Sequence, residues 1–156
     1  MGHEAHMRRA IALSLEMMRS NRGGPFGAVV VKDDTIIAEG FNQVTSTNDP
    51  TAHAEVVAIR RACQVLGTFD LTGCEIYTSC EPCPMCLSSI YWARLGRIYY
   101  ANDRVAAAKI GFRDDFLYKE VSLPLDQRAI PISPLLRDEG WAAFQEWMDK
   151  PDKVEY

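Results

Sequence analysis

Residues 50–55 of this chain are PTAHAE, and residues 82–86 are PCPMC. Each stretch stands where a helix is expected to begin, the first after a polar loop and the second after an apolar, strand-like run. Cys83 and Cys86 are three residues apart, so both sulfur atoms project from one face of a first helical turn. The positive end of the helix dipole favours thiolates there. With His53 they offer Zn²⁺ three ligands and leave a fourth position for water, as in catalytic zinc sites.

Glu55 stands two residues after His53, which is about 200° around a helix. The two side chains therefore share a site only if the end of the helix itself faces the metal. In that position Glu55 can take a proton from water and pass it to a leaving group. His-x-Glu followed by Pro-Cys-x-x-Cys is the signature of zinc-dependent base deaminases. The sequence thus predicts a catalytic zinc site with Glu55 as proton carrier.

Other interpretations of the cysteines stay open. A redox Cys-x-x-Cys pair would not need the His-x-Glu motif upstream. A closed structural zinc site needs a fourth ligand, and Cys80 would supply it. The chain has five cysteines, an odd count that disulfides cannot use up. We expect Cys63 and Cys74 to be buried as small apolar residues.

The composition is that of one globular domain spanning residues 1–156. Hydrophobic residues make up 47% and charged residues 24% of the 156, and the formal net charge is −4. A sequence pI near 5.4 argues against a protein whose affinity comes from neutralising phosphates. Charged residues interrupt the first twenty positions, and no apolar run approaches the length of a membrane span. We therefore expect a cytoplasmic protein without a membrane partner.

Helical and strand-like patterns alternate along the chain. Hydrophobic periodicity predicts strands at 28–31, 35–38, 74–78 and 97–101, and helices at about 4–20, 52–66, 82–94, 105–109 and 141–148. Thr51 is the expected N-cap of the second helix, Gly67 its left-handed C-cap and Pro82 the first residue of the third. Residues 111–134 are expected to be mostly irregular. This order predicts an α/β fold, a three-layer α/β/α sandwich with a central mixed sheet.

Six stretches carry a resemblance to a known family. They are NDPTAHAE at 48–55, TSCEPCPMC at 78–86, GGPFGA at 23–28, IYWAR at 90–94, FLYKE at 116–120 and EY at 155–156. The chain resembles the cytidine deaminase superfamily and, more narrowly, the bacterial guanine deaminases of that fold. The resemblance implies a cytidine deaminase-like fold. It also implies an aminohydrolase in which zinc-activated water replaces the amino group at C2 of guanine, giving xanthine and ammonia.

The same resemblance implies roles for particular residues. One Zn²⁺ per subunit would be held by His53, Cys83 and Cys86, and Glu55 would shuttle protons. Asp114, or the adjacent Asp115, would contact the purine and assist proton transfer. The remaining implied substrate contacts are Asn42 as a hydrogen-bonding residue, Phe26 and Trp92 as apolar walls, and Tyr156 as a residue that enters the pocket of a partner subunit. A homodimer that exchanges its C-terminal segment, about residues 135–156, is implied as well.

Three alternative functions share parts of this pattern. A tRNA adenosine deaminase would have the same zinc motif, but residues 137–156 hold three basic and six acidic side chains, the wrong sign for gripping RNA. A cytosine deaminase would use the same chemistry. A non-catalytic, deaminase-like binding module would not need Glu55. We expect a free nucleobase, rather than a nucleic acid, as the partner of this site.

Overall fold

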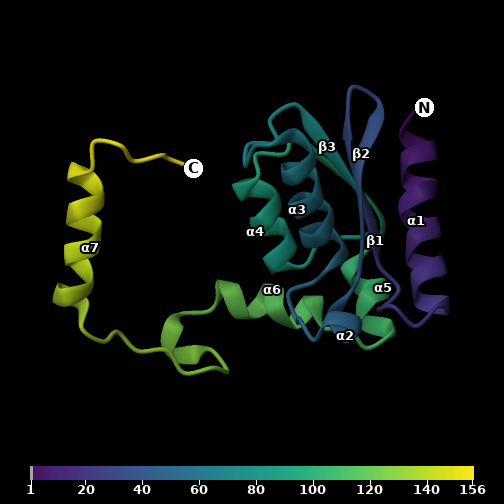
Figure 1. Cartoon of the computed structure of the whole chain (residues 1–156). Helices are drawn as coiled ribbons and strands as arrows, with labels where there is room; N and C mark the ends of the chain where they lie inside the picture. The colour runs from purple at the N-terminus through teal and green to yellow at the C-terminus, as the bar shows by residue number, and fades with distance from the viewer. Residues whose placement is uncertain (1) are drawn as a thin grey trace.

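A four-stranded mixed sheet forms the centre of the computed structural model, which describes residues 2–156 (Figure 1). Its strand order is β2-β1-β3-β4. β1 (Gly27–Lys32) is antiparallel to both β2 (Thr35–Phe41) and β3 (Cys74–Cys80), whereas β3 and β4 (Arg97–Asn102) are parallel. The predicted mixed sheet is therefore confirmed.

The β1–β2 hairpin follows from its turn residues. Asp33 and Asp34 have φ of 48° and 58°. Two consecutive residues with positive φ match the right-handed twist of the flanking strands, and aspartate tolerates this conformation better than most residues.

Helices cover both faces of the sheet, which completes the predicted three layers. α1 (His3–Arg19) covers one face, where its Leu13 packs with Val29, Val31 and Tyr77. α3 (Ala54–Leu66) lies against the other face, and α4 (Pro84–Trp92) packs beside α3 (Figure 1). Residues of β1 therefore alternate between two cores, as expected for a strand buried on both sides.

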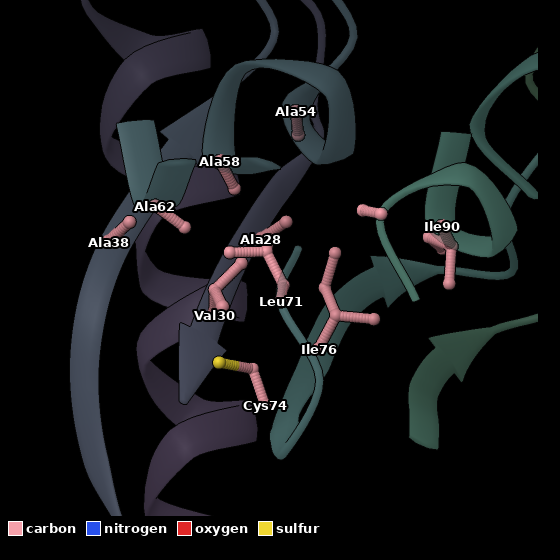
Figure 2. Close-up of a cluster of buried hydrophobic side chains, with 11 residues drawn as sticks. Ala28, Val30, Ala38, Ala54, Ala58, Ala62, Leu71, Cys74, Ile76 and Ile90 are labelled. Atoms are coloured by element: carbon pink, nitrogen blue, oxygen red, sulfur yellow. The ribbon is translucent and has the colours of Figure 1, made fainter. Parts of the chain in front are cut away.

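The approach of α3 to the sheet depends on small side chains. Ala54, Ala58 and Ala62 recur every four residues along the helix and belong to the core cluster of Figure 2. A Cβ atom added at Gly40 of β2 would lie 2.2 Å from the carbonyl oxygen of Ala54, so only glycine fits there. Cys74 is buried in the same cluster, as predicted, whereas Cys63 is only partly buried and packs against the cluster.

Both helices that carry the zinc motif begin later than the sequence predicts. The N-cap of α3 is His53, not Thr51, and the N-cap of α4 is Cys83, with Pro84 as the first helical residue in place of Pro82. Proline suits the first helical position in either case, because its missing N–H has no partner there. At the other end of α3, Gly67 is the left-handed C-cap that the sequence predicts.

The second half of the chain is more helical than expected. α5 (Arg104–Lys109) is followed by α6 (Asp114–Ser122), the short 3-10 turn η1 (Leu125–Gln127) and α7 (Arg137–Asp149). The expectation of mostly irregular chain over 111–134 is wrong where α6 forms. None of its residues is buried, and its apolar side chains Phe116, Leu117 and Val121 are exposed, so α6 adds little to the core.

Two peripheral features complete the fold. A single helical turn, α2 (Val44–Thr47), lies between β2 and α3. α7 stands away from the sheet and its covering helices (Figure 1), and none of its residues is buried. No helix among residues 2–156 combines the length and the apolar character that crossing a membrane requires.

Candidate active site

The N-terminal ends of α3 and α4 meet at one point. His53 and Cys83 are the two N-cap residues, and Cys86 lies in the first turn of α4. The Nδ1 atom of His53 is 3.6 Å from the Sγ atom of Cys83 and 3.4 Å from that of Cys86. Because the helix end itself faces this point, Glu55 reaches it too, with Oε2 3.4 Å from the Sγ atom of Cys86.

His53, Cys83 and Cys86 form a group able to hold a metal ion. Their ligand atoms all lie within 4.8 Å of one another, and both cysteines are buried. Two sulfurs and one imidazole nitrogen are a donor set that zinc prefers, and three protein ligands leave a position for water. Among residues 2–156 Cys80 does not join the group. Burial raises the pKa of its thiol to about 12, which keeps it protonated and a poor ligand.

The charges of the two cysteines also fit a cation. A hydrogen bond from the Cys86 thiol, with a further contribution from His53, lowers the pKa of Cys83 to about 4. The pKa of Cys86 is raised by its hydrogen bond to Cys83 and by burial. Without a cation the pair therefore carries one negative charge. A divalent metal allows both to be thiolates, since thiolate is the form that binds metal.

Glu55 is held as a buried carboxyl. It is 6% exposed, and burial raises its pKa. The hydroxyl of Thr78, on β3, lies 3.3 Å from its Oε1 atom. A carboxyl whose pKa moves toward neutrality can both accept and return a proton, as a general acid–base catalyst must.

A pocket of about 250 Å³ opens beside this group. It is lined by thirteen residues, among them His53, Glu55, Cys83, Phe26 and Asn42. The pocket thus brings three further predicted residues to the metal group. They are Phe26 from the loop before β1, Asn42 just after β2 and Asp114 from α6.

Asn42 is fixed by the glycine loop that precedes β1. Its Oδ1 atom accepts from the backbone N–H of Gly24 at 3.3 Å and of Val44 at 3.1 Å. A Cβ atom at Gly23 would lie 1.6 Å from the Asn42 carbonyl oxygen, so glycine is required for this approach. With Oδ1 engaged twice, the amide nitrogen is the atom that Asn42 offers to a ligand acceptor.

Asp114, not Asp115, lines the pocket. Burial is the main cause that raises the pKa of Asp114, and the negative charge of Cys83 adds to it. Asp115 instead pairs with Arg113, with Nε and Oδ1 3.1 Å apart. The two adjacent carboxylates that the sequence cannot separate therefore face different surroundings.

Trp92 and Tyr156 do not line this pocket. They are 67% and 72% exposed, and their ring centroids lie 6.0 Å apart at a separate hollow that also includes Cys63 and Phe69. Within its own chain, the structure brings these two predicted residues to each other but not to the metal group.

Phe112 and Glu81 are among the pocket residues that were not predicted from the sequence. Phe112 meets Phe26 edge to face, with ring centroids 4.8 Å apart, and Glu81 lines the wall next to Cys80. Phe112 follows a glycine in the segment that lacks periodicity, so no sequence signal marks it. Glu81 stands inside the quoted motif 78–86, where its acidic side chain between two cysteines was the available signal.

The site defines a zinc-binding deaminase. Residues 1–102 match the family model described as the cytidine and deoxycytidylate deaminase zinc-binding region, and the chain belongs to this family. It is 53% identical over 156 residues to the guanine deaminase of Bacillus subtilis (strain 168), with all of both chains covered. The crystal structure of a Bacillus subtilis guanine deaminase has a TM-score of 0.97 at 52% identity and covers 100% of this chain and 99% of that one.

Two further relatives bear on the substrate. A solved structure in complex with 8-azaguanine has a TM-score of 0.70 at 32% identity and covers 92% of this chain and 82% of that one. A tRNA-specific adenosine deaminase of Agrobacterium fabrum is 47% identical over 76 residues, which span 49% of this chain and 50% of that one.

We expect the substitution Cys86→Ala to remove zinc. Loss of one of three ligands should lower the metal affinity by at least about tenfold. Metal analysis of purified protein measures this, with Cys63→Ala as the control, because Cys63 lies outside the metal group. Equal zinc content in Cys86→Ala and the unaltered protein would contradict the ligand assignment.

Proposed function

We propose that this protein deaminates guanine hydrolytically, giving xanthine and ammonia. The observation that carries the proposal is a metal-binding group beside a buried Glu55 in a chain 53% identical, over its full length, to a guanine deaminase. The pocket of about 250 Å³ lies just below the roughly 300–1,000 Å³ of typical ligand sites, which suits a single base.

We assign the zinc ligands to Nδ1 of His53 and to the Sγ atoms of Cys83 and Cys86. When bound, zinc lowers the pKa of water toward neutrality and so supplies a nucleophile. Glu55 lies next to the sulfur of Cys86 and faces the same pocket. Its carboxyl is therefore placed to move protons between water and a base in the pocket.

The proposed reaction balances through Glu55. The oxygen of water forms a bond with C2 of guanine, and Glu55 passes the first proton of that water to ring nitrogen N3. The second proton goes to the amino nitrogen, whose bond to C2 breaks, so ammonia leaves and C2 becomes the carbonyl of xanthine. The raised pKa of Glu55 supports this role, because the carboxyl must accept and release a proton in turn.

The remaining pocket residues orient the purine. We propose that the amide nitrogen of Asn42 donates to an acceptor on the ring, since its oxygen is engaged by the backbone. Phe26 and Phe112 offer apolar surface for the flat base. Asp114 offers a carboxylate to the N–H groups of guanine, and its partial burial strengthens such a hydrogen bond.

The zinc-loaded protein should release ammonia from guanine. Ammonia release and xanthine formation are measured with guanine, adenine, cytosine and a tRNA that presents adenosine. We expect turnover on guanine and little on the other three. Turnover on cytosine or tRNA without turnover on guanine would overturn the substrate assignment while leaving the zinc site intact.

The substitution Glu55→Gln should abolish turnover and keep zinc. Removal of a general acid–base group costs about 10²–10⁴-fold in rate, and Glu55 is not among the three metal-binding residues. Initial rates and metal content are measured together, with Glu4→Gln as the control, because Glu4 forms an exposed pair with Arg8 far from the pocket. An active Glu55→Gln enzyme would remove Glu55 from the proton path.

We also propose a homodimer that exchanges residues 135–156. α7 stands away from the sheet and the helices of its own chain that cover it (Figure 1). Its large apolar side chains are exposed: Trp141, Phe144, Trp147 and Met148. A helix with such an apolar face is stabilised by covering it, and a second copy of the chain provides a surface of the same kind. In this arrangement Tyr156 serves the pocket of the other subunit, which agrees with its place outside its own.

Mixed dimers test this exchange. Deletion of Tyr156 should lower kcat/KM without loss of zinc, and Glu55→Gln subunits are inactive but carry an intact tail. The two variants are then refolded together. In each mixed dimer the pocket with Glu55 should receive the intact tail of its partner, so up to about half of the sites in the mixed dimers should regain activity. Activity no greater than the sum of the separate variants, or a monomer by light scattering, would contradict the exchange.

A further inference from the structure

α6 carries Asp114 into the pocket although the helix has no buried residue. Most helices in proteins are held by packing of an apolar face. The apolar side chains of α6, Phe116, Leu117 and Val121, are exposed, so within this chain its position depends on a small number of specific contacts. Those contacts decide where Asp114 lies relative to the metal group.

The firmest of these contacts comes from Tyr118. Its hydroxyl donates to the carbonyl oxygen of Pro82 at 2.5 Å. Pro82 directly precedes Cys83, one of the metal-binding residues. Asp114 and Tyr118 are four residues apart on α6 and therefore lie on the same side of the helix. One hydrogen bond thus ties the helix that carries Asp114 to the segment that carries Cys83.

Arg104 holds Tyr118 in place from the other side. The guanidinium carbon of Arg104 lies 3.6 Å from the centroid of the Tyr118 ring. The same guanidinium binds Glu81 through Nε at 3.0 Å and Nη2 at 2.8 Å, and the backbone N–H of Arg104 donates to the other carboxylate oxygen at 2.9 Å. A planar guanidinium can bind a carboxylate twice and stack on an aromatic ring at the same time, which lysine cannot do.

We propose that Arg104 and Tyr118 are positioning residues that clamp α6 to the segment between β3 and α4 and so hold Asp114 in the pocket. Glu81 is the anchor of the clamp, because its own N–H donates at 2.7 Å to the carbonyl oxygen of Asn102 at the end of β4. The clamp therefore joins α6 to the edge of the sheet without any apolar core. The inference rests on the proposed function, in which Asp114 binds the base.

The substitution Tyr118→Phe tests the clamp with the least disturbance. It removes the hydroxyl but keeps the ring under Arg104, so we expect an unchanged zinc content and a kcat/KM for guanine lowered by about tenfold. Amide hydrogen exchange over residues 114–122 should become faster, since α6 loses its anchor. Arg104→Ala should likewise lower kcat/KM and speed exchange over residues 114–122. Arg104→Lys should show nearly the same losses, because lysine cannot stack on the ring and bind Glu81 twice.

Tyr91→Phe is the matched control. Tyr91 is 75% exposed on α4, and its hydroxyl makes no hydrogen bond that the structure records among residues 2–156. The same loss of one phenolic oxygen should leave turnover and exchange over 114–122 unchanged. An equal effect of both substitutions would mean that the loss is not specific to the clamp.

A double-mutant cycle with Asp114→Asn separates positioning from general support of the fold. If Tyr118 acts through Asp114, Tyr118→Phe should change kcat/KM less than about twofold once Asp114 is already replaced. Losses that multiply, or unchanged turnover and exchange in Tyr118→Phe alone, would overturn the clamp. An unaltered enzyme that does not turn over guanine would instead overturn the proposed function, and exchange over 114–122 would still report on the clamp.

Discussion

Two thiol groups, an imidazole and a carboxyl lie together in a buried space where the N-terminal ends of α3 and α4 meet. Gathering such groups away from water is unfavourable unless charge and hydrogen bonds compensate for it. The positive ends of two helix dipoles favour negative charge there, and a divalent cation completes the compensation. The approach of the two helices and the binding of zinc therefore depend on each other.

The sheet makes this approach possible. β1 occupies the centre and buries residues on both faces, so α1 and α3 each gain a core. On the α3 side the contact consists largely of alanine and glycine, and Gly40 allows the backbone of α3 to lie close to β2. Larger residues would push α3 outward and carry His53 away from the cysteines of α4. The metal centre is thus positioned by close packing within the interior of the protein.

The substrate side of the pocket is built differently. Phe112 and Asp114 come from a region whose helices bury little, and polar contacts take the place of an apolar core. The bond between Tyr118 and Pro82 and the pairing of Arg104 with Glu81 are examples. Such contacts each contribute modestly to stability but have strict geometry. A rigid metal centre is therefore combined with a substrate wall whose position rests on a few hydrogen bonds.

The amino-acid sequence by itself determined the strands, the mixed sheet, the metal-binding motifs and the zinc-dependent class of enzyme. These depend on local signals: hydrophobic periodicity, a left-handed C-cap at Gly67, and cysteines three residues apart at a helix start. Only the tertiary structure decided that His53 and Cys83 are themselves the N-caps and that Asp114 rather than Asp115 faces the pocket. It also revealed α6, whose apolar side chains are exposed within this chain, and placed Tyr156 outside the pocket of its own chain. The reason is physical: local patterns report which side chains are buried, whereas a pocket depends on which distant segments lie together.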